Sequence, residues 1–330
     1  MEGLEMSTFW KNQNVAVTGA TGMVGSWLVK QLLADGANVS ALIHERDPLS
    51  ELIRSGDIER VSCVDGDLRD INSIFKLIET NQAETIFHLG AQTIVGEALK
   101  NPTDTFESNI LGTWNLMEVA RQKKKQIKRV LVASSDKAYG TSATLPYDET
   151  TPLNGEGPYD VSKSCTDLIA QAYFKTYQVP TVIARCGNIY GGGDLNWSRI
   201  VPGTIKDLIE GKIPIIRSNG KFLRDYIYVE DAVHAYLKMA ECIDSGTANG
   251  ESFNFSREEP IDVLTIYKAV CIETVGKYVE PKILNSASNE IVDQHLSSKK
   301  ACSQLNWGSK YTLSEGIKLT VEWYRKYLTN

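Results

Sequence analysis

The spacing of three glycines near the N-terminus constrains the fold more than any other feature of the sequence. Gly19, Gly22 and Gly25 follow an apolar segment, NVAVT, at three-residue spacing, and they lie in GATGMVGSWLVKQLL, which leads into a predicted helix. Glycine at these spacings allows a tight turn, a close approach of backbone N–H groups to a pyrophosphate, and close contact between helix and strand. The pattern therefore predicts the first strand, turn and helix of a Rossmann-type sheet that binds a dinucleotide. The residues expected to touch the dinucleotide here are Gly19, Thr21, Gly22, Met23, Val24 and Gly25.

Short apolar segments alternate with helical periodicity along most of the N-terminal half, which is typical of a parallel sheet covered on both faces. We predict an α/β fold with a Rossmann doubly wound parallel sheet. Its strands are expected near 14–18, 38–43, 60–64, 85–90, 129–134 and 180–186. Ligands bind beyond the carboxyl ends of the strands in such sheets, so the loops that follow the strands are where functional residues are expected.

The alternation weakens after Asn188, which predicts a second, smaller C-terminal α/β lobe over the substrate. A helix is expected near 203–211, and the segment SFNF is expected to return to the sheet as one more strand. The expected division is a cofactor-binding domain over 1–187 with 225–255 returning to it, and a substrate-binding lobe over 188–224 and 256–330.

Composition excludes several classes of function. The net charge of −6 argues against a nucleic-acid partner, because a negative surface repels a polyphosphate backbone. The six cysteines show no CxxC spacing, which favours reduced thiols and a cytoplasmic location. No apolar run approaches the roughly 20 residues needed to cross a bilayer, and the N-terminal segment lacks the pattern of a signal peptide, so no membrane partner is expected. No spacing of His, Cys and carboxylates resembles a metal site.

Three further loops are expected to complete the cofactor site. The second strand ends before Glu45 and Arg46, where a carboxylate suits the ribose hydroxyl of NAD and an arginine suits the extra phosphate of NADP. Both cofactors therefore remain open, and NAD is mildly favoured. The loop residues expected to line the rest of the site are Asp67, Leu68, Leu89, Gly90, Ala91 and Asn109. Without the glycine turn, these would be read equally well as ordinary turn residues.

Tyr159 and Lys163 lie four residues apart at the start of an amphipathic segment, so their side chains share one helix face. A lysine ammonium close to a phenol favours the phenolate and would lower the tyrosine pKa from about 10 toward neutrality. The pair is then a base for an alcohol proton. A YxxxK match alone is common, but here it follows a dinucleotide turn and a strand that ends in Ala133-Ser134-Ser135.

The chain resembles the extended short-chain dehydrogenase/reductase family. The similarity rests on TGATGMVG, HLGA, the set Ser135, Tyr159 and Lys163, and the segments RCGNIYG and RDYIYVED. The resemblance implies a nucleotide-diphosphate hexose as substrate and a homodimer that pairs the helices near 104–122 and 160–176. It also implies that Ser135 and Tyr159 bracket the 4-hydroxyl group of the sugar. The remaining residues that it implies for substrate binding are Gln92, Asn188 and Arg224.

The reaction is suggested by Asp136 and Lys137, which follow Ser135 at the end of a strand. The segment SDK is similar to that of CDP-glucose 4,6-dehydratases and of certain UDP-N-acetylglucosamine dehydratases, whereas RDYIYVED is not. A dehydratase needs an acid to expel the 6-hydroxyl group and a base for the proton of carbon 5. We predict that Asp136 is the acid and Lys137 the base, in a 4,6-dehydratase that yields a 4-keto-6-deoxyhexose. An uncharged Lys137 requires its pKa to fall by about three units, or about 4 kcal/mol.

Several alternatives stay open. Asp136 and Lys137 could form a simple ion pair, or Lys137 could contact the diphosphate. The chain could be a nucleotide-sugar 4-epimerase, or a dinucleotide-binding sensor without turnover. His88 lies within an apolar segment and is expected to be a packed core residue and not a catalyst.

Overall fold

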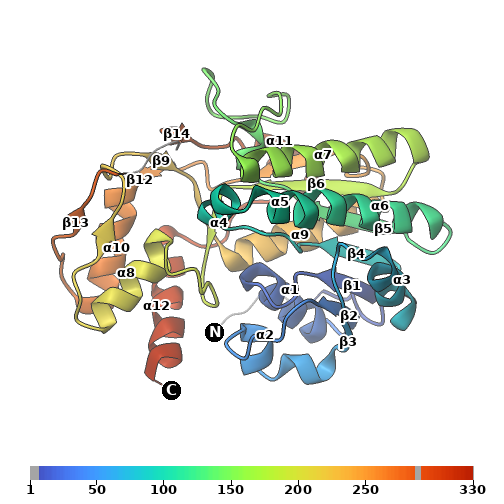
Figure 1. The fold of residues 1–330 in the computed structure, drawn as a ribbon, viewed down its shortest axis with the longest axis horizontal. Coiled ribbons are helices and arrows are strands. Elements are labelled where there is room, and N and C mark those ends of the chain that lie inside the picture. The colour runs from blue at the N-terminus through green and yellow to red at the C-terminus, as the bar shows by residue number, and fades with distance from the viewer. Residues whose placement is uncertain (1–6, 287–290, 330) are drawn as a thin grey trace.

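Seven parallel strands form the central sheet of the computed structural model, which describes residues 7–286 and 291–329 (Figure 1). The order across the sheet is β11-β6-β5-β4-β1-β2-β3. The strands are β1 Asn14–Thr18, β2 Asn38–Ile43, β3 Ser62–Asp65, β4 Thr85–His88, β5 Arg129–Ala133, β6 Thr181–Cys186 and β11 Ser252–Phe255. The predicted doubly wound sheet is confirmed, and SFNF joins it beside β6.

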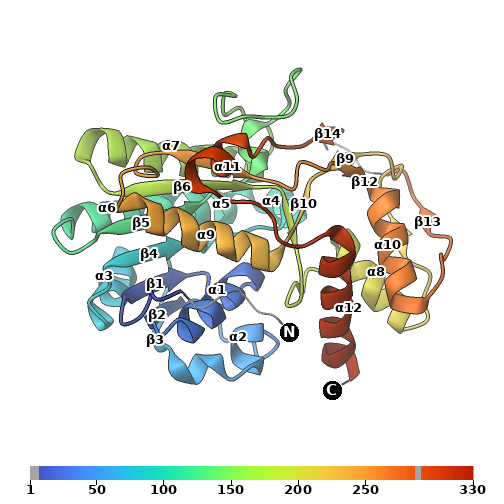
Figure 2. The ribbon, with the colours of Figure 1, turned by 180° about the vertical axis from the view of Figure 1, so that it is seen from behind.

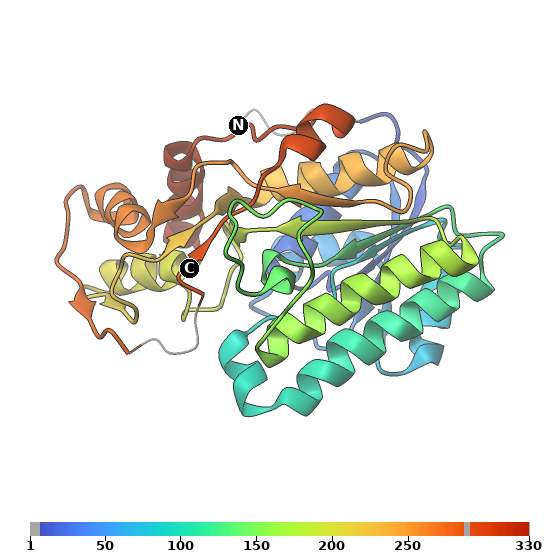
Figure 3. The ribbon, with the colours of Figure 1, turned by 90° about the horizontal axis from the view of Figure 1, so that it is seen from above.

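Two sets of helices cover the two faces of the sheet (Figure 2, Figure 3). The first set comprises α1 Met23–Ala34 and α9 Val229–Ile243. The second comprises α3 Ile71–Thr80, α6 Gly112–Gln122 and α7 Pro158–Tyr177. Each set shares a buried apolar core with the strands, so β6 is buried along its whole length. This explains why its sequence, TVIARC, shows no alternation of polar and apolar residues.

Shorter elements connect these layers. A π-helical turn, η2 (Glu107–Leu111), continues α5 (Pro102–Phe106) into α6, so the three form one unbroken helical stretch. Helix α7 begins with a proline, which suits the first helical position. The shorter elements are α2 Glu51–Arg54, η1 Asp57–Arg60, α4 Val95–Lys100, α5 Pro102–Phe106, η2 Glu107–Leu111 and η3 Asp136–Tyr139.

The second lobe packs three helices around its own aromatic core, which includes Tyr190, Tyr228 and Tyr324. Its helices are α8 Ile200–Ile209, α10 Val263–Val275 and α12 Leu313–Thr329. Its short strands are β7 Asn188–Tyr190, β8 Ile215–Ile216, β9 Leu223–Arg224, β10 Tyr226–Tyr228, β12 Ile261–Asp262, β13 Lys282–Ile283 and β14 Asp293–Gln294. Helix α8 begins three residues earlier than predicted, because Pro202 is tolerated within the first helical turn.

Part of the range 256–330 packs against the sheet and not with this lobe. Helix α11, Lys299–Leu305, contacts β11 and α9, and Leu305 and Trp307 lie in the core beneath α9. Within the described ranges, no helix combines the length and apolar character that would let it cross a membrane.

The lobe is joined to the start of α1. The indole Nε1 of Trp27 donates to the carbonyl of Gly192 at 2.8 Å, and Met23 and Val24 pack against the core of the lobe. The turn between β1 and α1 therefore lies at the junction of the two parts. It also lies where the strand order reverses between β1 and β4, the usual ligand site of such sheets.

The glycines of this turn are required by contact distances. A Cβ atom on Gly25 would lie 2.0 Å from the carbonyl oxygen of Gly19, and one on Gly19 would lie 2.6 Å from the amide nitrogen of Gly90. Gly19 also has a φ of +74°, which favours glycine. A Cβ atom on Gly22 would meet the same carbonyl at an ordinary 3.4 Å.

We therefore expect Gly25→Ala to lower the free energy of unfolding by about 3 kcal/mol, because the new methyl group must push α1 away from the turn. Gly22→Ala is the matched control and should cost about 1 kcal/mol or less. Urea unfolding of both variants measures the difference. Equal losses would show that the Gly25 contact does not hold the turn.

Candidate active site

The turn after β1 meets the loop after β4 through their backbones. The amide of Gly90 donates to Thr18 Oγ1 at 3.1 Å, and a Cβ atom on Gly90 would lie 2.8 Å from the side chain of Leu68. The structure thus brings together three predicted cofactor segments: the glycine turn, Leu68, and the Leu89-Gly90-Ala91 loop. Helix α1 has no side-chain cap, so its first N–H groups are available to an anion.

The loops after β2 and β3 carry charged side chains. Glu45 is exposed, and Arg46 forms a salt bridge of 3.0 Å with Asp65. Asp67 accepts hydrogen bonds from Arg69 at 2.6 and 2.9 Å. Burial raises the pKa of Asp67, but the hydrogen bonds and charge of Arg69 outweigh burial and leave the pKa below its usual value. Asp67 is therefore an anion at neutral pH.

A buried polar chain runs from the glycine turn to α6 and α7. His88 accepts or donates at both ring nitrogens, to Thr18 at 2.8 Å and to Thr113 at 3.0 Å. Burial, helped by the charge of Lys163, lowers the pKa of His88 to about 3, so the imidazole is neutral. The prediction of a packed core histidine is confirmed.

Asn109, in the π-helical turn, is also buried. Its Nδ2 donates to the carbonyl of Gln92 at 3.0 Å and to Ser162 Oγ at 2.8 Å, while its Oδ1 accepts from the amide of Gln92 at 2.7 Å. Ser162 in turn donates to the carbonyl of Tyr159 at 2.7 Å. Asn109 thus positions Gln92 and the first turn of α7; its direct contact with a cofactor stays a prediction.

Tyr159 and Lys163 share the first turns of α7, as predicted, but their electrostatics differ from expectation. Lys163 is buried, its Nζ donates to the carbonyl of Ala133 at 2.9 Å, and burial lowers its pKa to about 8. Burial raises the pKa of Tyr159 to about 12, although the charge of Arg199 and a hydrogen bond with Ser135 oppose it. The predicted fall toward neutrality is therefore wrong for the protein alone, because desolvation of the phenolate outweighs the nearby cations.

Ser135 links Tyr159 to Asp136. Its hydroxyl donates to Asp136 Oδ1 at 3.0 Å, accepts from the amide of Lys137 at 3.2 Å, and acts to lower the pKa of Tyr159. These bonds cap η3, the turn that carries both Asp136 and Lys137. Ser135 thus belongs to the pair that is expected to bind the 4-hydroxyl group, and it also contacts Asp136, the expected acid.

Asp136 is 4% exposed, and its Oδ2 has no hydrogen-bond partner among the described residues. Burial raises the pKa of Asp136, although the charges of Lys137 and Arg224 and the Ser135 hydroxyl oppose the rise. Lys137 is half-buried and its charge also acts on Asp160. Lys137 therefore lies near two carboxyl groups, Asp136 and Asp160.

Two of the predicted substrate-binding residues, Arg224 and Asn188, lie close to Asp136 or to its neighbour Asp225. Arg224 is buried, and its Nη1 donates to the carbonyls of Leu223 and Val292, each at 2.8 Å. Asn188 is exposed, and its Nδ2 donates to the carbonyl of Asp225 at 3.2 Å. Gln92, in the loop after β4, forms hydrogen bonds with Ile94. The charge of Arg224 reaches Asp136, so the expected diphosphate and acid positions are neighbours.

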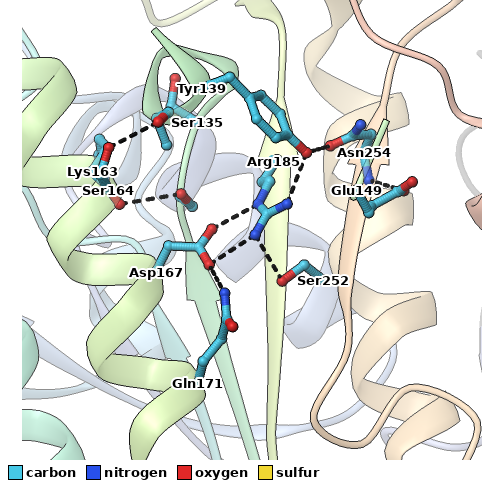
Figure 4. A network of polar contacts seen from close by, with 12 residues as sticks. Ser135, Tyr139, Glu149, Lys163, Ser164, Asp167, Gln171, Arg185, Ser252 and Asn254 are labelled. Carbon is cyan, nitrogen blue, oxygen red and sulfur yellow. Dashed lines mark hydrogen bonds and ion pairs between the residues drawn. The ribbon is translucent and has the colours of Figure 1, made fainter. Parts of the chain in front are cut away.

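A buried ion pair lies behind η3 and was not predicted from the sequence (Figure 4). Arg185 of β6 contacts Asp167 of α7 at 2.7 and 2.9 Å, with both side chains buried. Arg185 also donates to the hydroxyl of Tyr139 at 2.8 Å, which donates to Asn254 of β11 at 2.7 Å. Tyr139 ends η3, so this network attaches the turn bearing Asp136 to two strands and a helix.

We expect Arg185→Ala to lower the free energy of unfolding by about 3–5 kcal/mol, because it leaves the carboxylate of Asp167 buried without its cation. Lys100→Ala, which breaks an exposed pair with Glu97, is the control and should cost less than about 1 kcal/mol. Denaturant unfolding of both variants checks the prediction. A small loss in the Arg185 variant would mean that the pair does not anchor the turn.

The described part of the chain contains no cluster of three or more His, Cys, Asp or Glu side chains placed to hold a metal ion.

Comparison with known proteins agrees with this geometry. The model of the NAD dependent epimerase/dehydratase family matches residues 15–255. The chain belongs to this family. The resemblance to extended short-chain dehydrogenases/reductases is thereby confirmed.

Similar proteins of this family carry out two reactions. CDP-glucose 4,6-dehydratase of Salmonella typhimurium is 29% identical over 97% of this chain and 92% of its own length. UDP-glucose 4-epimerase of Thermotoga maritima, solved with UDP-glucose, has a TM-score of 0.86 at 27% identity, over 96% of this chain and 100% of its own. dTDP-glucose 4,6-dehydratase of Bacillus anthracis, solved with NAD, has a TM-score of 0.83 at 25% identity, over 95% and 97%.

Proposed function

We propose that this protein is a 4,6-dehydratase that converts a nucleotide-diphosphate hexose into the 4-keto-6-deoxyhexose. The observation that carries the proposal is the buried Asp136, whose pKa is raised, beside the amine of Lys137 and linked through Ser135 to Tyr159. A raised pKa suits a general acid at neutral pH. Relatives named as CDP-glucose and dTDP-glucose 4,6-dehydratases support the same reaction.

The residues present fit a nicotinamide dinucleotide. The close approach of Gly19 to Gly90 and the uncapped start of α1 suit a pyrophosphate, with Thr21, Met23 and Val24 beside it. When bound, this cofactor accepts a hydride from carbon 4 and returns one to carbon 6. We favour NAD, because Arg46 is engaged by Asp65 while the carboxylate of Glu45 is exposed and can bind a ribose hydroxyl.

The roles of the side chains follow from their places. Tyr159 accepts the proton of the 4-hydroxyl group, which Ser135 orients. Its pKa of about 12 has to fall in the complex, and additional positive charge brought close to the phenol by a bound oxidised nicotinamide would lower it. Lys137 can act as the base only after its ammonium group has lost a proton; the amine then accepts the proton of carbon 5, which the 4-ketone acidifies. Asp136 protonates the departing 6-hydroxyl group. Arg224 and Asn188 hold the diphosphate.

A 4-epimerase is the second candidate, since the Thermotoga maritima epimerase has a closely similar fold. It would use the same tyrosine and lysine but would not expel water.

The six cysteines have free thiols in the structure, which supports the further proposal that the protein acts in the reducing cytoplasm.

Product analysis separates the candidates. The purified protein is incubated with NAD and CDP-, GDP-, UDP- and dTDP-hexoses, and products are identified by mass and NMR. We expect one substrate class to lose one water and gain a 4-keto group. An equilibrium mixture of carbon-4 epimers, without loss of water, would replace the dehydratase by the epimerase. Cofactor binding without turnover of any hexose would favour the sensor.

With the active substrate, Lys137→Ala should slow solvent exchange of the carbon-5 proton by about 10²-fold or more, because the base is lost. Oxidation at carbon 4, followed as reduced nicotinamide, should persist. Lys128→Ala is the control, since Lys128 pairs with Glu84 at the opposite end of β5. Unchanged dehydration in the Lys137 variant would refute its role as base.

We also propose a homodimer formed through α6 and α7, which lie side by side (Figure 3). Trp114 of α6 and Leu168 of α7 are 54% and 52% exposed, unusually large values for such apolar side chains. Burial of both against a second copy would remove this apolar surface from water.

The double variant Trp114→Glu, Leu168→Glu should therefore sediment as a monomer, whereas the natural chain sediments as a dimer. Ile213→Glu is the control, because the side chain of Ile213 is also apolar and exposed, at 65%, but lies on the second lobe. A wild-type protein that is monomeric at micromolar concentration would contradict the dimer.

A further inference from the structure

Two carboxyl groups near the turn η3 are buried without a full set of partners. Asp225, between β9 and β10, is 1% exposed; its Oδ2 accepts from the amide of Leu296 at 2.6 Å. Its Oδ1 has no partner within the described residues, and the same is true of Oδ2 of Asp136. Each group thus keeps one oxygen that is shielded from water and accepts no hydrogen bond, a costly arrangement for a carboxylate.

These two groups repel one another electrostatically. Burial, followed by smaller effects that include the negative charge of Asp136, raises the pKa of Asp225 to about 6, although the Leu296 amide and the Ser256 hydroxyl oppose it. Two carboxyl groups that interact in a buried site titrate as a pair, because ionisation of one raises the pKa of the other.

The other charged and titratable groups that face the pair do not neutralise it fully. Lys137 and Arg224 lower the pKa of Asp136, but the charge of Lys137 is shared with Asp160. Glu258 adds negative charge on the side of Asp225. The negative charge of Asp136 also raises the pKa of Asp160, so Asp160 is a further carboxyl group close to Asp136. The other groups that interact with Asp136 carry no charge at neutral pH, and they are Tyr147, Tyr159 and Cys186.

We propose that Asp225 is a positioning residue that shares one proton with Asp136 and so keeps Asp136 in its acid form at neutral pH. The inference rests on the proposed function, in which Asp136 is the acid of the elimination. The segment RDYIYVED alone does not show this role for Asp225, because Asp225 and Asp136 are far apart in the sequence and only the fold brings their charges close together.

Proton balance supports the pairing. Asp136 loses its proton to the departing 6-hydroxyl group, which leaves as water, and the pair is then doubly ionised. Tyr159 meanwhile holds the proton of the 4-hydroxyl group, while the proton of carbon 5 passes to Lys137 and back. The hydroxyl of Ser135, which interacts with the phenol of Tyr159 and donates to Asp136, offers a path for that proton. The repulsion between the two carboxylates drives its return, and the site ends with the protons it began with.

The first test is the pH dependence of kcat/KM. A general acid is active below its pKa and inactive above it, so Asp136 sets the alkaline limb, whereas the bases Tyr159 and Lys137 set the acidic limb. Asp225→Asn retains an acceptor for the Leu296 amide but removes the negative charge. The alkaline limb should then move to lower pH by about one unit, a tenfold loss of the acid form above its pKa. Asp225→Glu should restore the limb.

Asp231→Asn is the matched control. Asp231 is as buried as Asp225, accepts from the backbone amides of Lys310 and Tyr311, and has a pKa that burial raises to about 6. The charges that face it are those of Arg257 and Glu230, so its removal should leave the alkaline limb in place. An alkaline limb that stays fixed in Asp225→Asn, or moves equally in Asp231→Asn, would overturn the proposal.

A second measurement does not depend on turnover. The carboxyl carbon of Asp136 is titrated by NMR in the cofactor-bound protein labelled with ¹³C-aspartate, and its resonance is assigned by its loss in Asp136→Asn. The midpoint should fall by about one unit in Asp225→Asn. An unchanged midpoint would overturn proton sharing even in an active dehydratase. A shifted midpoint in a protein that does not dehydrate any hexose would retain the sharing and contradict only the proposed reaction.

Discussion

The contact between the backbones of Gly19 and Gly90 is the constraint on which the rest of the site depends. No side chain fits between them, so the turn after β1 and the loop after β4 lie as close as two chains can. This contact lies where the strand order reverses, between β1 and β4. The start of α1, which follows the turn, contacts the second lobe through the bond from Trp27 to Gly192. The other segments of the candidate site follow elements of the same sheet domain: η3 comes directly after β5, and Tyr159 and Lys163 lie at the start of α7.

Much of the sheet could be predicted, because strands buried on both faces read as short apolar segments between glycine-rich or polar turns. All six expected strands and the returning SFNF strand are present, with ends that differ by at most two residues. Less could be predicted of the C-terminal part. Its strands are two or three residues long, too short for a periodic pattern, and the packing of α11 against β11 depends on a long connection.

The candidate site was predictable as a set of positions but not in its electrostatics. Spacing alone placed Tyr159, Lys163, Ser135 and Asp136 in one region. Spacing cannot reveal desolvation, however, which raises the pKa of Tyr159 where a lysine four residues away suggested a fall. The Arg185–Asp167 pair and Asp225 were missed for a related reason. Their partners are distant in sequence, and only the fold brings η3, α7, β6 and β11 together.

The buried network behind η3 has a consequence for how such proteins diverge. Arg185, Asp167 and Asn254 hold Tyr139 at the far end of the turn, and Ser135 holds its near end. The turn that carries residues 136 and 137 is therefore held at both ends by other residues, so its position does not depend on which side chains stand at 136 and 137. The side chains at these two positions can therefore be exchanged while the residues that hold the turn stay in place, and known epimerases and dehydratases do share this architecture.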